Sequence, residues 1–114
     1  MEESILTSIK NLLGILDEDT SFDLELISLI NGAISDLTQI AVGPDAGFMI
    51  TGYTETWNDF VSNVAMMSSA RLYIFCKVRL LFDAPTNSFI CDAFTKNRDE
   101  AYWRLYIMAD RKEV

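Results

Sequence analysis

The chain has 114 residues, with 17 acidic and 9 basic side chains, no histidine, and a formal net charge of −8 at pH 7. This length favours a single domain, residues 1–114, whose core needs neither disulfides nor metal. The charge argues against specific nucleic-acid binding, because such proteins gather lysine and arginine to neutralise phosphates. The lack of histidine excludes Ser–His and Cys–His pairs and Cys/His zinc sites.

Hydrophobic residues make up 50% of the chain, a high share for so short a domain. A small domain has limited interior volume, so part of this apolar surface stays outside the core. We therefore expect it to be buried against other subunits.

The start of the chain is acidic and lacks the basic region of a signal peptide. Arg71, Lys77 and Arg79 interrupt the longest apolar region, so no segment is expected to span a membrane. We expect synthesis in the cytoplasm and no membrane contact.

Residues 5–13 are predicted to form a short helix, because their apolar side chains recur on one face and Gly14 can end the helix in a left-handed conformation. The acidic residues Asp17, Glu18 and Asp19 follow. A calcium site is one interpretation of them, but the glycine and the distal glutamate of an EF-hand are missing. A solvated turn before the next helix fits better.

An amphipathic helix of about twenty residues is predicted next. Thr20 or Ser21 can cap it, and acidic side chains in the first turn suit the positive end of the helix dipole. Gly43 and Pro44 follow its end. Its apolar stripe comprises Phe22, Leu26, Leu29, Ile30, Ala33, Ile34, Leu37 and Ile40.

Residues 43–56 contain Gly43, Pro44, Gly47 and Gly52, which predict a loop with a short extended piece at residues 48–51. A turn of helix is expected near residues 56–60. Connections of this length inside a small helical domain are usually functional or mobile.

Two further helices complete an all-α fold of four to five helices with a long protruding loop. The first spans residues 63–82 and is apolar nearly all round, so we expect it to be buried on most sides. Residues 83–85 break it with a proline. The second begins within residues 86–88 and is expected to fray in the charged tail of residues 110–113.

The sequence gives no indication of a catalytic residue, a metal or a cofactor. Cys76 and Cys91 lie far apart, and we expect two buried, reduced thiols. The glycines of residues 43–52 match no phosphate-binding loop, since no lysine follows them. Ordinary surface ion pairs explain the charged side chains of the last helix.

Three cations on the most apolar helix, Arg71, Lys77 and Arg79, allow two interpretations. Each can extend its stem along apolar surface or pair with an acid of the same chain. Alternatively, they form salt bridges between subunits. The aromatic residues that suit core packing or a subunit interface better than a small-molecule site are Tyr53, Trp57, Phe60, Trp103 and Tyr106.

Six strings follow one another along nearly the whole chain: TSFDLELI (20–27), GFMITG (47–52), ETWNDF (55–60), YIFCKVRLLFD (73–83), PTNSF (85–89) and WRL (103–105). In order and spacing they resemble the phage head–tail connector family, also called head-completion adaptors, of siphophages and prophages. The chain departs from this family at Ala84, where relatives tend to have a second proline, and at Cys76, which stands at a usually aliphatic position. The family has no catalytic motif to carry over.

The resemblance implies a structural protein that forms a homo-oligomeric ring, typically of about twelve subunits. The ring would lie in the virion at the head–tail interface, between the phage portal protein and a tail-proximal connector or stopper protein, after assembly in the host cytoplasm. DNA would pass through the lumen without specific binding, and an acidic lumen would attract it little.

In such a ring we expect residues 43–56 and the helix at 63–82 to supply much of the subunit contact, with Phe48, Ile50 and Trp57 anchored in a neighbour's pockets. Replacing Trp57 with alanine is then expected to reduce ring formation and to leave the monomer helical. The alternative is a small helical protein-binding or regulatory module that acts as a monomer or dimer. The expected interface residues are Phe48, Ile50, Tyr53, Trp57, Arg71, Lys77 and Arg79.

Overall fold

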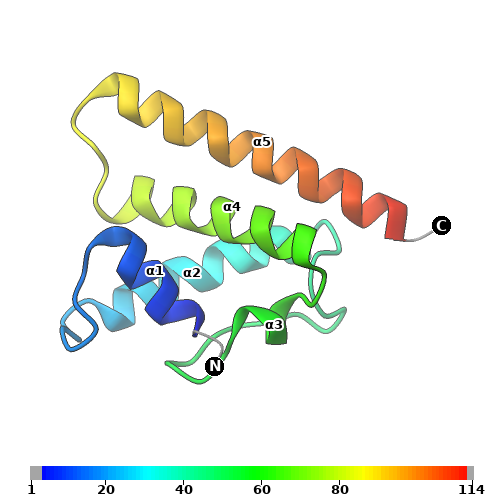
Figure 1. The fold of residues 1–114 in the computed structure, drawn as a ribbon, viewed down its shortest axis with the longest axis horizontal. Helices are drawn as coiled ribbons and strands as arrows, with labels where there is room; N and C mark the ends of the chain where they lie inside the picture. The colour runs from blue at the N-terminus through cyan, green and yellow to red at the C-terminus, as the bar shows by residue number, and fades with distance from the viewer. Residues whose placement is uncertain (1–3, 113–114) are drawn as a thin grey trace.

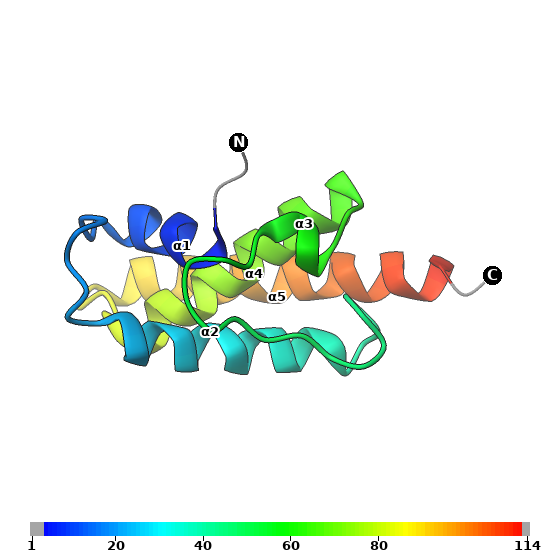
Figure 2. The same cartoon turned by 90° about the horizontal axis from the view of Figure 1, so that it is seen from below.

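The computed structural model describes residues 4–112, and this part of the chain forms five α-helices and no β-strand (Figure 1). The all-α prediction is confirmed. Figure 2 shows α1 and α3 on one side and α2 on the other side of the layer that α4 and α5 form. The helices are α1 (Ile5–Leu13), α2 (Asp23–Thr38), α3 (Trp57–Phe60), α4 (Val64–Phe82) and α5 (Ser88–Lys112).

Helix α1 has the bounds that its sequence predicts. The Ser4 side chain caps its first turn by accepting a hydrogen bond from the backbone N–H of Thr7. Gly14 ends it with φ 81° and donates its own N–H to the last turn. The buried face of α1 is formed by Ile5, Leu6 and Ile9.

The predicted cap of α2 at Thr20 or Ser21 is wrong. The helix begins at Asp23 after Phe22, whose side chain makes no capping bond. Residues 19–21 are held instead in a turn, in which the Asp19 carboxylate accepts the backbone N–H of Ser21. Because these residues form the turn, they do not extend the helix toward its N-terminus.

Helix α2 also ends earlier than its apolar stripe suggests. The backbone N–H of Val42 bonds the carbonyl of Leu37, and Ala41 takes a left-handed φ of 67°. This is the hydrogen-bond pattern of a helix C-terminus, with alanine where glycine is usual. The side chain of Val42 is thereby turned into the core, where it is fully buried.

Caps define the next two helices. Thr56 and Asp59 form a reciprocal capping box at α3, and the Asn63 side chain accepts the N–H of Met66 at the start of α4. Both helices have the predicted positions. The turn after α4 contains Pro85, as expected.

The core lies between α4 and its neighbours. Ala70, Ile74 and Val78 of α4 are fully buried, together with apolar residues of α1, α2 and the loop before α3. Helix α5 contributes Ala101, Leu105 and Ala109, which recur on one face. The two thiols are free: Cys76 is buried, which raises its pKa, whereas Cys91 is only half-buried, contrary to expectation.

The left-handed glycines of the loop provide a first test of the fold. Gly43 (φ 93°) lies so close to the buried Phe60 ring that an added Cβ would stand 2.5 Å from Cε1. We expect Gly43→Ala to cost about 2–4 kcal/mol of unfolding free energy, from backbone strain plus overpacking. Urea denaturation followed by circular dichroism measures the loss.

The matched control for this substitution is Gly47→Ala. Gly47 has nearly the same φ, 94°, but its Cβ would meet nothing within 4 Å. Only the strain of about 1 kcal/mol should then appear. Equal losses in the two variants would show that the Phe60 contact does not constrain Gly43.

Candidate subunit interface

The loop of residues 43–56 is fixed to the helices at several points. The Asn31 side chain of α2 binds the backbone of Ile50 in both directions, accepting its N–H at 2.7 Å and donating to its carbonyl at 3.0 Å. The N–H of Ile5 bonds the carbonyl of Glu55 at 2.9 Å. Phe48 packs on Phe60 with ring centroids 5.3 Å apart. The loop therefore has one defined conformation against the core.

A fully buried lysine joins this loop to α1 and α2. Lys10 of α1 is 0% exposed. Its Nζ lies 3.0 Å from Asp23 Oδ1, 2.8 Å from the Tyr53 hydroxyl, and 3.2 Å and 2.7 Å from the backbone carbonyls of Asp17 and Asp19. The Tyr53 hydroxyl in turn donates to Asp23 Oδ2 at 2.5 Å. One ammonium group thus joins the distant loop, at Tyr53, to the turn after α1 and to the start of α2.

These contacts also set the charge state of Lys10. Burial by itself lowers the pKa of a lysine, but the hydrogen bonds with Tyr53 and Asp23 outweigh it and raise the pKa of Lys10 above its ordinary value of 10.5. The group is therefore positive throughout the neutral range, and its charge is balanced inside the protein.

Two residues expected at the interface belong to the core of the subunit. Ile50 and Trp57 are each 1% exposed. To enter a neighbour's pocket they would have to leave their own, so alanine at Trp57 is expected to open a cavity and destabilise the monomer. Phe48 is half-buried, and Tyr53 is 43% exposed although its hydroxyl is bound internally.

The three cations of α4 have partners within the chain. The ammonium of Lys77 and the hydroxyl of Tyr73 both bind the Asp36 carboxylate of α2. Arg79 pairs with Asp83, at 2.9 Å. The Arg71 guanidinium lies over the Trp57 ring, 5.3 Å from its centroid. The intramolecular interpretation therefore describes Lys77 and Arg79 in this structure, and a role of these cations between subunits stays a prediction.

A further exposed surface lies on α5, of which the sequence interpretation named only Trp103 and Tyr106, as residues suited to core packing or an interface. Only one face of this helix packs on α4. On the opposite face, exposed residues follow one another at intervals of three or four positions in the sequence, so their side chains form one stripe along the helix. Trp103 is 61% exposed and stacks on Tyr106, with ring planes 7° apart and centroids 5.8 Å apart. We call this stripe the α5 outer face; it comprises Phe89, Ala93, Lys96, Glu100, Trp103 and Ile107.

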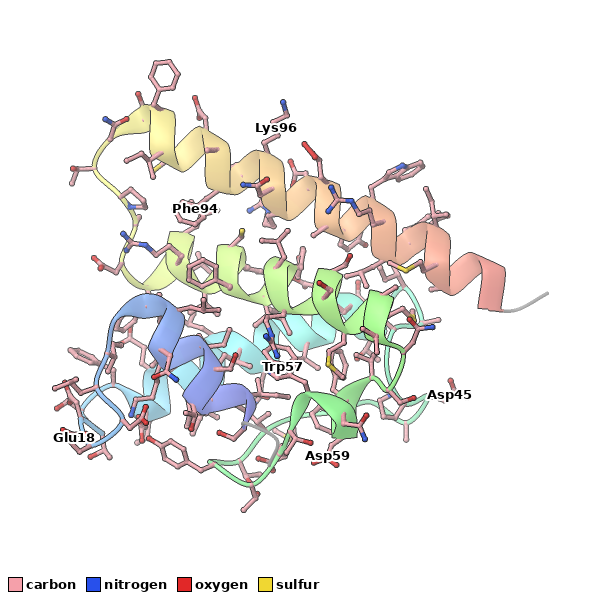
Figure 3. The ribbon with its side chains drawn as sticks, viewed as in Figure 1. Glu18, Asp45, Trp57, Asp59, Phe94 and Lys96 are labelled. Atoms are coloured by element: carbon pink, nitrogen blue, oxygen red, sulfur yellow. The ribbon has the colours of Figure 1, made fainter. Side chains whose placement is uncertain are left out.

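Figure 3 makes the two sides of α5 visible. Phe94 points toward α4, where its ring meets that of Phe75 at 5.8 Å, whereas Lys96 points away from the bundle. The sequence carried a usable signal for this surface. Ala101, Leu105 and Ala109 define the inner side, and Trp103 and Ile107 lie off it.

A second exposed apolar group lies at the turn between α1 and α2. Leu16 and Leu24 are 67% and 85% exposed, and Asp17, Glu18 and Glu25 surround them in sequence. We call these five residues the acidic end. Glu18 projects outward there, far from Asp45 at the other end of the molecule (Figure 3).

A cleft of about 610 Å³ opens between the start of the loop, the α3–α4 junction and α5. None of its lining residues is ionisable, so the Ser62 hydroxyl, which also lines the cleft, has no acid or base beside it there. Within residues 4–112 no group of acidic or cysteine side chains is arranged to hold a metal ion. In the same part of the chain, no helix is both long and apolar enough to cross a membrane.

The exposed apolar surfaces of the subunit suit contacts with other proteins, and the comparison with protein families agrees with this. Residues 5–112 match the family described as phage connector protein. The chain belongs to the phage connector protein family. No curated protein and no solved structure matches it.

Membership gives the chain its general role. Phage connector proteins are structural proteins. As a connector the chain is a virion component of the head–tail interface and interacts with other head or tail proteins. The earlier resemblance to this family is confirmed.

The buried lysine can be tested by Lys10→Met, which keeps the length of the side chain and removes its charge. Asp23, whose side chain is only 16% exposed, would lose its cation. We expect a loss of about 3 kcal/mol of unfolding free energy, because removing one partner of a buried pair leaves the other uncompensated. Urea unfolding at pH 7 measures it.

Lys77→Met is the matched control, since both members of the Lys77–Asp36 pair are more exposed. It should cost less than about 1 kcal/mol. Because the pKa of Lys10 is raised in the fold, its contribution is present below pH 10.5 and is lost as the pH rises through the folded value. The gap between wild type and Lys10→Met should therefore narrow above pH 10.5; a gap that is constant with pH would contradict the assignment.

Proposed function

We propose that this connector forms a ring of about twelve identical subunits between the phage portal protein and a tail-proximal connector or stopper protein. The observation that carries the proposal is the family match over residues 5–112, joined to an aromatic helix face that the subunit leaves exposed. Assembly would take place in the host cytoplasm before the ring enters the virion.

The exposed apolar residues support assembly through two different faces. The α5 outer face and the acidic end lie on different sides of the molecule. A contact between unlike faces continues from copy to copy and closes into a ring if the rotation permits. A contact of one face with itself would stop at a dimer.

The charge of the chain suits a channel for DNA. Residues 1–63 hold eleven acidic side chains and a single cation, Lys10, which is buried. A lumen lined by this part of the subunit would repel phosphates, so DNA would pass without specific binding.

The loop of residues 43–56 is also proposed to contribute to the interface, and the burial of each side chain decides whether it contacts the neighbour directly. Ile50 and Trp57 would act by fixing the loop, whereas Phe48 and Tyr53 present side chains that a neighbour can reach. Arg71, which is exposed above Trp57, would add a cation at the same surface. Lys77 and Arg79 would have to exchange their internal partners to take part.

Phage particles and purified components test the proposal together. We expect a phage that lacks this gene to yield filled or empty heads without tails, and the purified protein to form a ring on portal particles that electron microscopy can count. Tailed, infectious particles in the absence of the protein would refute the proposal. So would a protein that stays monomeric or dimeric with portal present.

Trp103→Ser is expected to prevent ring formation on the portal while leaving the melting temperature within about 2 °C, because surface substitutions cost little stability. Val64→Ser serves as the control: Val64 is also an exposed apolar residue, but it lies in the first turn of α4, outside the α5 outer face. Rings that form equally well with both variants would remove α5 from the interface.

A further inference from the structure

We infer that the α5 outer face of one subunit packs against the acidic end of the next copy in the ring. The inference rests on the proposed function and specifies which surfaces meet. It assigns the neighbour's acidic end as the surface that covers the stacked aromatic pair on α5.

The α5 outer face has the chemistry of an interface centre. Trp103 and Tyr106 form a stacked pair, and Phe89 is 85% exposed at the start of the same helix. Large aromatic side chains supply much of the binding energy where they become fully covered. The charges beside them are largely balanced, since Arg104 pairs with Glu100 at 3.6 Å and Arg98 with Asp99 at 3.1 Å.

Lys96 and Asp92 are the two charged side chains of α5 outside these pairs, among the residues whose side chains are described. Lys96 stands on the outer face, where a carboxylate of a neighbouring copy can reach it. Figure 3 shows it pointing away from the bundle. An exposed cation within an aromatic stripe fits a partner surface that is both apolar and acidic.

The acidic end has this combination. Leu16 and Leu24 offer exposed apolar side chains, and Asp17, Glu18 and Glu25 carry negative charge next to them. The nearby Lys10 cannot neutralise them from outside, because it is fully buried and bound to Asp23. Tyr53 lies beside this end through its bond to Asp23, so the part of the loop around Tyr53 continues the same surface.

Charge decides which faces can pair. Two acidic ends would repel each other, because like charges placed opposite one another oppose association. The cations of the chain are concentrated elsewhere: residues 64–114 hold eight basic and six acidic side chains, against one and eleven in residues 1–63. The half of the chain that can complement the acidic end is therefore the one that carries α5.

A charge exchange tests the pairing. Lys96→Glu and Glu18→Lys each replace an attraction with a repulsion at an exposed contact. Each should therefore raise the dissociation constant for assembly on the portal about three- to tenfold. The double variant restores an opposite pair across the interface, and we expect its affinity to return to within about twofold of wild type.

Asp45→Lys is the matched control, because Asp45 is exposed at the other end of the molecule (Figure 3). It changes the net charge as Glu18→Lys does and should leave the affinity unchanged. Rings that form with the portal but weaken equally in Asp45→Lys, or that the double variant does not rescue, would overturn the pairing and leave the proposed function intact. A protein that never assembles would overturn both.

Cross-linking separates the unlike contact from a symmetric one. Leu16→Cys and Ala93→Cys, each with Cys91→Ser, are assembled on the portal singly or mixed, and a short bis-maleimide reagent is added; Ala93 is an exposed member of the α5 outer face outside the aromatic pair. Cross-linked dimers are expected in the mixture and not in either variant alone. An Ala93→Cys dimer formed alone would show that α5 meets α5, and this would refute the inference.

Discussion

The ammonium group of Lys10 is the contact on which the shape of this connector depends. It gathers the turn after α1, the start of α2 and the loop before α3 around one buried charge. Without that charge, two backbone carbonyls would lose the Lys10 donor, and Asp23 would keep only the Tyr53 hydroxyl and no cation. The position of the acidic end follows from this cluster, because the turn that carries Asp17 and Glu18 is bound to Lys10 through its backbone carbonyls and both side chains stay exposed.

The helices could be predicted from the sequence because apolar spacing and capping residues are local signals. Gly14, Thr56 and Asn63 mark their boundaries in the structure as they do in the sequence. The start of α2 could not be read in this way. Thr20 and Ser21 are suitable caps, but the turn held by Lys10 and Asp19 competes for them, and the Lys10 contact comes from the preceding helix and not from residues beside the cap.

The candidate site was predictable only in part for the same reason. Trp57 looked like an anchor because tryptophan is favoured at interfaces, yet the capping box of α3 and the Arg71 contact place it in the core. Lys10 gave no sign of its role, since a lysine beside Ile9 reads as an exposed residue of an amphipathic helix. The α5 outer face was accessible in principle from the angular positions of Ala101, Leu105 and Trp103.

The one-sided packing of α5 has a consequence for how the connector responds to assembly. In the free subunit this helix of 25 residues is supported mainly by α4. Local opening should therefore occur at a lower free energy in α5 than in α2 or α4, and its amide hydrogens should exchange with solvent earlier. Burial of the outer face in a ring would give α5 a second supporting layer, so that the same amides become slow to exchange and report the closure of the ring.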